Sequence, residues 1–308
     1  MTPASDAPPS TSGTPPAEGV TSLYKYTSFD TARIVLASGR LRWTTPPLLN
    51  DPYDLSFDLQ LEVEPQRVRE LAIDLLWSDW LDDGTPAPQV LFEAWKQMTK
   101  AERPDLDRAE FESVVGPIVS ASIRRAESTA DMNAELQSYL QRAKLLCLSE
   151  TPGSMLMWSH YARQHYGAVL RFTREGASNA FGTARPVRYV EKMPRFGDSA
   201  ALAGMITGRL QNPKTLSDSQ IYSKAADWSY EREWRMQLGF GRDRQAPFED
   251  LPFGPEELTG VVMGCRMSGP NRTELARLAR QLNPEVSLLC ARPSSRDFAM
   301  LIEPWDAS

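Results

Sequence analysis

Short strand-like runs separated by helical segments of uneven length are the feature that most constrains how this chain can fold. Runs such as "SLYKY", "RLRWT", "LLCLSE", "GAVLRF", "YEREWRMQLGF" and "LTGVVMGCRM" have the length and composition of strands. The helical segments between them do not recur at the regular interval of βαβ units. Neither GxGxxG nor GxxxxGK[ST] follows a strand in this sequence. The pattern therefore predicts an α+β fold and disfavours the classical dinucleotide-binding and P-loop folds.

A long helical stretch interrupts these strands between about residues 65 and 144. The segments "EPQRVRELAIDLLWSDWL", "PQVLFEAWKQMTKAE" and "DLDRAEFESVVGPIVSASIRRAE" carry apolar residues at a spacing of three to four. Trp77, Trp80, Phe92 and Trp95 belong to these stripes, which favours buried helix faces over an aromatic ligand cage. We interpret the stretch as a helical insertion in a single domain of residues 21–308.

Residues 1–20 differ in composition from the rest of the chain. They consist mostly of Pro, Ser, Thr, Gly and Ala and offer little to bury, which predicts a disordered tail. The tail is either a solubilising leader or a targeting signal for secretion or localisation. The whole chain, with 41% hydrophobic and 24% charged residues, has the composition of a globular protein.

Charge and cysteine content narrow the classes of partner. The formal net charge is -6 and the Lys and Arg residues form no dense run, so nonspecific binding to nucleic acid is not expected, although a local basic site stays compatible. Three cysteines without CxxC spacing predict neither a disulfide framework nor a zinc site.

No Sec signal and no long apolar run is present, so no membrane association is expected. We expect a cytoplasmic protein, with a secreted effector as the alternative.

Both histidines of the chain lie in "MLMWSHYARQHYGAVLRF". His160 and His165 are five residues apart, which on a helix separates them by about 140°, so they do not share a face as a helical metal-binding pair does. A mixed site with Asp or Glu, and a nucleophilic arrangement with Ser or Cys, stay open as alternatives. A structural or substrate-orienting role is favoured for both residues, with His160 nearer to function. We predict no bound metal.

The stretch "WSYEREWRMQLGF" carries two neighbouring glutamates. In an extended strand, Glu231, Glu233 and Arg235 would share one face. Two carboxylates so placed raise the pKa of one of them and suit a general-base or polarising role. The alternatives are a solvated strand face, or a helical turn with an ion pair between Glu231 and Arg235.

The order of the motifs resembles that of an uncharacterised bacterial family, domain of unknown function 2971. The segments that carry the resemblance are "LYKYTS", "LNDPYD", "LCLSE", "MWSHYA" followed by "HYG", "YEREWR" and "LTGVVMGCRMS". It covers roughly Leu23 to Arg292 and is weakest in the helical stretch. The layout of this family is similar to the ADP-ribosyltransferase superfamily, which implies split mixed β-sheets with a helical insertion and a cleft for NAD between the sheets.

The resemblance also implies roles for individual residues. Lys25 stands where the superfamily has a first-strand His, and Ser149 where it has a middle-strand Ser. "YEREWR" looks like the final E-x-E motif, with Glu233 as the catalytic carboxylate and Glu231 as its substrate-facing partner. The residues implied to line the NAD site are Tyr24, Lys25, Tyr26, Ser149, Trp158, His160 and Tyr161.

The chemistry of NAD cleavage gives these residue types a reason. Breaking the nicotinamide-ribose bond builds oxocarbenium character, which a glutamate carboxylate stabilises. Lys25 supplies a point charge for a phosphate but not the two-nitrogen geometry of His. The register of the first strand stays open, because a slip of one residue exchanges the faces of Tyr24, Lys25 and Tyr26.

The resemblance thus implies an NAD-dependent ADP-ribosyltransferase that uses NAD as a substrate and modifies a macromolecule. The acidic net charge favours a protein acceptor over a nucleic acid. The setting that it suggests is a bacterial toxin, effector or phage-defence protein. Two alternatives stay open: a noncatalytic module that binds a nucleotide or partner, and a metal-dependent phosphodiesterase or nuclease in which Asp51, Asp54, His160 and the two glutamates gather a divalent cation.

Overall fold

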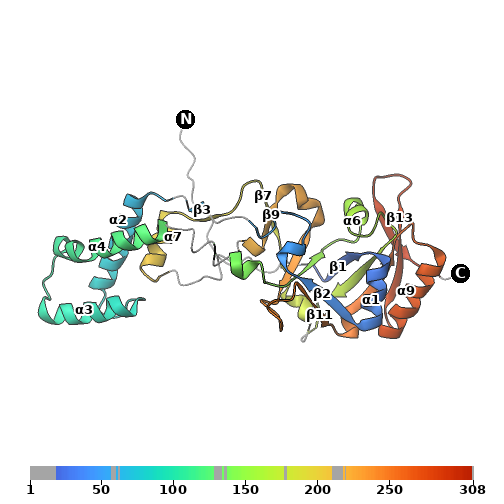
Figure 1. Ribbon diagram of the computed structural model, residues 1–308, viewed down its shortest axis with the longest axis horizontal. Helices are drawn as coiled ribbons and strands as arrows, with labels where there is room; N and C mark the ends of the chain where they lie inside the picture. Colours follow the sequence, from blue (N-terminus) through green and yellow to red (C-terminus); the bar gives the residue numbers. More distant parts are fainter. Residues whose placement is uncertain are drawn as a thin grey trace.

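The computed structural model describes residues 19–56, 60–61, 63–127, 134, 137–176, 179–209, 218 and 220–306. The disordered tail expected for residues 1–20 therefore lies almost entirely outside the described residues. The predicted α+β class is confirmed, because helices accompany a mixed β-sheet. Figure 1 shows the sheet at one end of the molecule and a group of helices at the other.

Ten of the described strands form one mixed sheet. Eight of them follow one another in the order β11 (Phe248–Pro252), β2 (Arg40–Thr44), β4 (Leu145–Ser149), β1 (Ser22–Thr27), β5 (Ala168–Thr173), β12 (Leu258–Met263), β13 (Ser287–Pro293) and β14 (Met300–Pro304). The other two are β10 (Glu233–Gln237), which pairs with β4, and β6 (Arg185–Pro186), which pairs with β10. Among these strands β12 and β13 run parallel, and the other pairs are antiparallel.

Strand β4 is where this sheet divides. On one side β4 pairs with β10 along its whole length, from Ser149 opposite Glu233 to Leu145 opposite Gln237. On its other side β4 meets β1 at the single pair Tyr24–Ser149, and meets β2 at the single pair Thr44–Leu145. Strands β1 and β4 are therefore paired only at Ser149 and separate along β4 toward Leu145. In the gap, Nζ of Lys25 donates to the carbonyl of Cys147 at 2.8 Å, so a side chain meets β4 there.

Two helices cover one face of the sheet and enclose the main core. They are α1 (Phe29–Ser38) and α9 (Gly269–Leu282), which contact each other (Figure 1). Helix α1 begins at Ser28, whose side chain accepts from the Thr31 N–H, and ends at Gly39 in the left-handed region. Buried residues of both helices, such as Leu36 and Leu275, pack on sheet residues in this core.

The short helix α6 (Met155–His160) lies over the opposite face. After it, Arg163, Gln164 and His165 all have positive φ, and the segment returns to strand β5 through Gly167. The N–H of Gly264 donates to the carbonyl of Gly167, and a Cβ added at Gly264 would lie 2.0 Å from the His165 carbonyl oxygen. Only glycine allows this close approach, which fixes α6 beside β5 and β12.

The second group of helices has its own core. It consists of α2 (Pro65–Leu81), α3 (Val90–Glu102), α4 (Arg108–Glu127) and α7 (Ser199–Ile206). The rings of Trp77, Trp80, Phe92 and Trp95 pack around the buried Phe111 with centroid distances of 5.1 to 6.3 Å. The expectation that these aromatic residues form buried helix faces is confirmed. Helix α7 comes from outside the 65–144 stretch, so the helical group is built from two segments of the chain.

Short elements connect the two ends of the molecule. Strands β3 (Gln60–Leu61) and β8 (Arg195–Gly197) form one parallel pair, and β7 (Arg188–Val190) and β9 (Ser223–Ala225) form another. The 3-10 helices of the described residues are η1 (Pro46–Leu48), η2 (Ala180–Thr183), η3 (Ala226–Glu231) and η4 (Pro255–Glu257). No helix in the described part of the chain is long and apolar enough to cross a bilayer.

Candidate functional site

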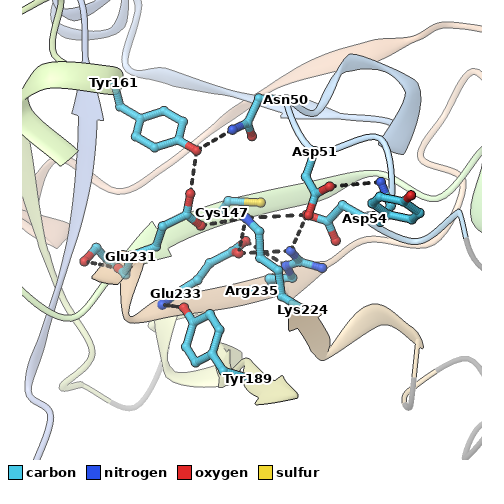
Figure 2. Close-up of polar contacts among 12 residues, drawn as sticks. Asn50, Asp51, Asp54, Cys147, Tyr161, Tyr189, Lys224, Glu231, Glu233 and Arg235 are labelled. Carbon is cyan, nitrogen blue, oxygen red and sulfur yellow. Dashed lines mark hydrogen bonds and ion pairs between the residues drawn. The ribbon is translucent and has the colours of Figure 1, made fainter. Parts of the chain in front are cut away.

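A cluster of buried charged side chains lies at the start of β10 (Figure 2). Glu233 and Arg235 come from β10, Glu231 ends η3, Lys224 lies on β9, and Asp54 comes from the loop after η1. Each of the five is at most 6% exposed. Charged groups are buried at this level only when they are paired, so their contacts decide what the cluster can do.

Arg235 holds two of the carboxylates. Its Nε lies 2.7 Å from Oε1 of Glu233 and its Nη2 lies 2.9 Å from Oε2 of the same residue. Nη2 also donates to Oδ2 of Asp54 at 2.6 Å, and Nη1 donates to the carbonyl of Ile221 at 2.7 Å. The guanidinium is thus bound on all sides by fixed acceptors, as a fully buried arginine requires.

Lys224 is shared by three carboxylates. Its Nζ lies 2.6 Å from Oε2 of Glu231, 3.1 Å from Oε2 of Glu233 and 3.6 Å from Oδ2 of Asp54. Three acids face two cations, so the cluster carries one excess negative charge when every group is ionised. Oδ1 of Asp54 is buried without a hydrogen-bond partner among the described residues.

The pKa values of the two glutamates are shifted in opposite directions. Burial raises the pKa of Glu231, and the attraction of Lys224 only partly offsets it. Burial would also raise the pKa of Glu233, but Arg235 and Lys224 outweigh it and hold this pKa well below its usual range. Burial likewise raises the pKa of Asp54. Glu233 is therefore firmly ionised, while Glu231 and Asp54 are the groups that retain a proton more readily.

The local backbone explains how Glu231 and Glu233 both reach Lys224. An extended strand through both residues was expected, and this expectation is wrong: β10 begins at Glu233, and Arg232 before it has a φ of +45°. The left-handed residue turns the chain from η3 into the strand. Glu233 and Arg235 do share a strand face, but the alternative of a solvated face is wrong because both are buried.

Tyr161 connects Glu231 to the protein surface. Its hydroxyl donates to Oε1 of Glu231 at 2.5 Å and accepts from Nδ2 of Asn50 at 2.7 Å (Figure 2). Tyr161 is half-buried and Asn50 is exposed. Burial and the adjacent Glu231 raise the pKa of Tyr161, so its hydroxyl stays protonated and remains a donor.

Aromatic rings border the same side of the cluster, and we call His160, Tyr161, Trp228 and Tyr230 the aromatic rim. The ring centroid of His160 lies 6.1 Å from that of Tyr230 and 6.4 Å from that of Tyr161. Trp228 lies 6.0 Å from Tyr230, and Nζ of Lys224 lies 5.0 Å from the centroid of its ring. The rim therefore places flat, partly accessible π faces next to the Glu231 carboxylate.

The sheet register brings Tyr24 and Ser149 to the face of the cluster. Ser149 is paired with Glu233 on one side and with Tyr24 on the other, and paired residues point to the same face. The Ser149 hydroxyl donates to the carbonyl of Glu231 at 2.7 Å. Ser149 thus fixes the backbone of the glutamate, and Tyr24 packs in the same apolar group as Tyr161 and Tyr230.

The other residues proposed from the sequence have different surroundings. Lys25 follows Tyr24 on β1, so its side chain leaves the opposite face and reaches the carbonyl of Cys147. Tyr26 donates to the carbonyl of Thr151 and packs at 5.6 Å on Trp158, whose Nε1 donates to the carbonyl of Pro152. His165 stacks on Trp158, away from Glu231. His160 lies in the rim.

Sequence reasoning missed several contributors to the site. Lys224 had no recognisable motif around it, because "YSKAAD" offers neither periodicity nor a known spacing. Asn50 and Asp54 lie in "LNDPYD", which was noted as a motif, but Asp54 entered only the metal-binding alternative. Its role as a partner of Arg235 depends on a contact between residues 181 positions apart, which a single sequence does not reveal.

The carboxylates named for a metal site have other partners. Asp54 and the two glutamates bind Arg235 and Lys224, and Oδ1 of Asp51 accepts the N–H of Tyr53. Within the described ranges, no group of three or more His, Cys, Asp and Glu side chains is arranged to hold a metal ion. The geometry therefore gives no support to the phosphodiesterase or nuclease alternative.

Comparisons with known proteins bear on this region. Residues 157–236 match the family model described as "Protein of unknown function (DUF2971)". No curated protein and no solved structure gave a significant match. The matched segment runs from α6 into β10 and includes Tyr161, Lys224, Glu231 and Arg235, but not Asn50 or Asp54. Over this segment the chain thus resembles the family that the order of its motifs indicated, the proteins of unknown function DUF2971.

Proposed function

We propose that this chain is an ADP-ribosyltransferase that cleaves NAD and that Glu231 is its reacting carboxylate. The observation that carries the proposal is the position of Glu231: a buried carboxylate bound by Tyr161 and Lys224, directly beside the aromatic rim. A carboxylate with few competing contacts, next to flat aromatic surfaces, suits the cleavage of a planar cationic leaving group from a sugar.

The geometry favours Glu231 over Glu233 for this role, which exchanges the roles that the resemblance implied. Glu233 accepts three bonds from Arg235 and Lys224, and these donors hold it in place. Glu231 accepts one bond from Tyr161 and one from Lys224. Because a carboxylate offers about four lone-pair positions, Glu231 keeps acceptor capacity for ribose hydroxyls.

The aromatic rim and the cluster fit the charges of the proposed reaction. The nicotinamide ring of NAD is a planar cation, which stacks on aromatic faces and is attracted by their π electrons. When the glycosidic C–N bond breaks, nicotinamide leaves with the electron pair and the ribose carbon gains oxocarbenium character. The ionised Glu231 carboxylate stabilises that carbon. An acceptor nucleophile then bonds to the carbon and releases a proton, which Glu231 can accept.

The division of the sheet supports the same proposal. The ADP-ribosyltransferase arrangement calls for split sheets with a cleft between them, and β1 and β4 share a single residue pair beside Glu231. On the face of the cluster, β1 contributes Tyr24 rather than Lys25. We therefore assign the contact with the nucleotide to Tyr24. The acceptor is a macromolecule, and a toxin, effector or defence protein remains the proposed setting.

Nicotinamide release from NAD by the purified protein, with cell lysate as the source of acceptor, tests this function. We expect release by the wild type and a loss of about 100-fold or more in Glu231→Gln. Asp227→Asn is the matched control, because Asp227 is an exposed acid on the same 3-10 helix, η3, and it should retain full activity. Absence of nicotinamide release by the wild type, whether or not it binds NAD, would refute the proposal.

One observation favours the noncatalytic alternative. All three carboxylates of the cluster are engaged by Lys224 or Arg235, as in a purely structural ion-pair network. In a module that only binds a nucleotide or a partner, calorimetry would detect NAD binding by the wild type and by Glu231→Gln alike, with no nicotinamide released by either protein.

A further inference from the structure

A basic cleft lies at the far end of β10 from the carboxylate cluster. It is open to solvent and has a volume of about 620 Å³, and its lining includes Arg40, Phe240, Arg242, Arg244 and Glu249. Strand β10 separates it from Glu233 by roughly 13 Å along the chain direction. A volume of this size accommodates a ligand as large as a nucleotide.

The wall of this cleft is held by a buried lysine. The turn "GFGRDR" after β10 carries Gly239 and Gly241 at positive φ. Lys144, whose side chain is fully buried, donates from Nζ to the carbonyls of Phe240 and Asp243 and lies 3.9 Å from Oε2 of Glu249. The turn is therefore a fixed element that presents Phe240 and the arginines in a defined arrangement.

The cleft has an excess of positive charge, although the whole chain is acidic. Three guanidiniums, those of Arg40, Arg242 and Arg244, face the single carboxylate of Glu249. Nε of Arg242 pairs with Glu249, and Arg40 donates to the carbonyl of Asp250. Arg244 is exposed and makes no ion pair within the described part of the chain, so its charge is available to an anion.

An aromatic ring lies among these guanidiniums. The guanidinium carbon of Arg244 lies 4.9 Å from the centroid of the Phe240 ring, and that of Arg142, beside the cleft, lies 5.4 Å from it. Tyr139 packs at 5.0 Å against Phe240. A base entering the cleft meets an aromatic ring and a guanidinium plane, both of which are stacking surfaces, while the unpaired Arg244 meets a phosphate.

We infer that the cleft around Phe240 and Arg244 is a binding site for single-stranded nucleic acid, which inserts an unstacked base beside Phe240 and places a phosphate on Arg244. A phosphopeptide fits less well, because Arg40 and Arg242 already bind protein acceptors and leave no converging set of free guanidiniums for one phosphate. The paired bases of a duplex cannot reach the ring. This site is separate from the carboxylate cluster and does not depend on NAD cleavage.

Fluorescence anisotropy with a short fluorescein-labelled oligo(dT), in the absence of NAD, tests the inference. We expect the wild type to bind the strand and Arg244→Gln to bind it more weakly. In a plot of the logarithm of the association constant against the logarithm of the salt concentration, the negative slope should become shallower by about 0.7 in this variant. Phe240→Leu should weaken binding at least about fivefold with an unchanged slope, because it removes a stacking surface and no charge. Arg280→Gln, which changes an exposed arginine of α9, is the matched control and should bind like the wild type.

Three results would overturn the inference. They are no binding by the wild type, an equal loss in Arg280→Gln and Arg244→Gln, and tighter binding of a phosphoserine peptide or a duplex of the same length. Circular dichroism melting of each variant shows whether it is folded. If Phe240→Leu proves unstable, Arg244→Gln alone decides, because the Arg244 side chain is exposed.

Discussion

The Glu233 carboxylate and the Arg235 guanidinium meet in a two-point contact on one face of β10, with N–O distances of 2.7 and 2.9 Å. Both side chains are buried, and Lys224 joins them from β9. This contact makes Glu233 the structural centre of the cluster. Glu231, two residues before Glu233 at the end of η3, is the carboxylate that contacts Tyr161.

We predict that Glu233→Gln destabilises the protein by about 3–5 kcal/mol, because it leaves two buried cations with one fewer anion. The free energy of unfolding in urea measures this loss. Glu303→Gln is the matched control: Glu303 makes a similar two-point contact with Arg292, but on the surface, and its removal should change the unfolding free energy far less. Equal effects of the two substitutions would show that burial adds nothing to the pair at Glu233.

The same pair predicts a pH dependence. The pKa of Glu233 is lowered on folding, so its ionised form stabilises the folded state above the ordinary value of 4.5, and this contribution is lost as the pH falls further. Asp54 and Glu231 have raised pKa values and act in the opposite direction, and because the charge of Glu233 contributes to both shifts, Glu233→Gln makes both shifts smaller. We therefore expect the stability difference between wild type and variant to be constant near neutral pH and to shrink below about pH 4.5. Urea unfolding at a series of pH values checks this.

Local patterns in the sequence predicted much of the fold. The three-to-four spacing of apolar residues identified α2, α3 and α4, and the two-residue period placed Glu233 and Arg235 on one face. These features depend on neighbours along the chain. The positive φ of Arg232 was not predicted, because arginine rarely adopts this conformation and nothing in "YEREWR" signals it.

The candidate site was only half predictable for a related reason. Tyr161, Glu231 and Glu233 were recognised through motifs, whereas Lys224 and Asp54 join the cluster through contacts between distant segments. The face of Lys25 was also undetermined, because it follows from the pairing of Tyr24 with Ser149 and from no property of β1 itself.

The proposed role of Glu231 predicts a distinctive pH profile for Tyr161→Phe. The Tyr161 hydroxyl donates to the ionised carboxylate and lowers the pKa of Glu231, so its removal raises that pKa further. The acidic limb of nicotinamide release should shift to higher pH. Tyr166→Phe, at an exposed position five residues on, is the control and should leave the profile unchanged. A uniform loss of rate at every pH would mean that Tyr161 only supports the packing of the rim.

The left-handed turn before β10 predicts that glycine at position 232 gives a more stable protein than alanine does. Arg232 has a φ of +45°, its side chain is largely exposed, and its one ion pair, with Glu150 at 3.5 Å, lies near the surface. A left-handed conformation costs an L-residue roughly 1–2 kcal/mol, and glycine avoids that cost. Both Arg232→Gly and Arg232→Ala remove the ion pair, so their difference isolates the backbone. Because glycine also loses more entropy on folding, we expect Arg232→Gly to be about 0.5–1 kcal/mol more stable than Arg232→Ala in urea unfolding. Equal stabilities would show that the turn between Glu231 and Glu233 relaxes when the arginine side chain is removed.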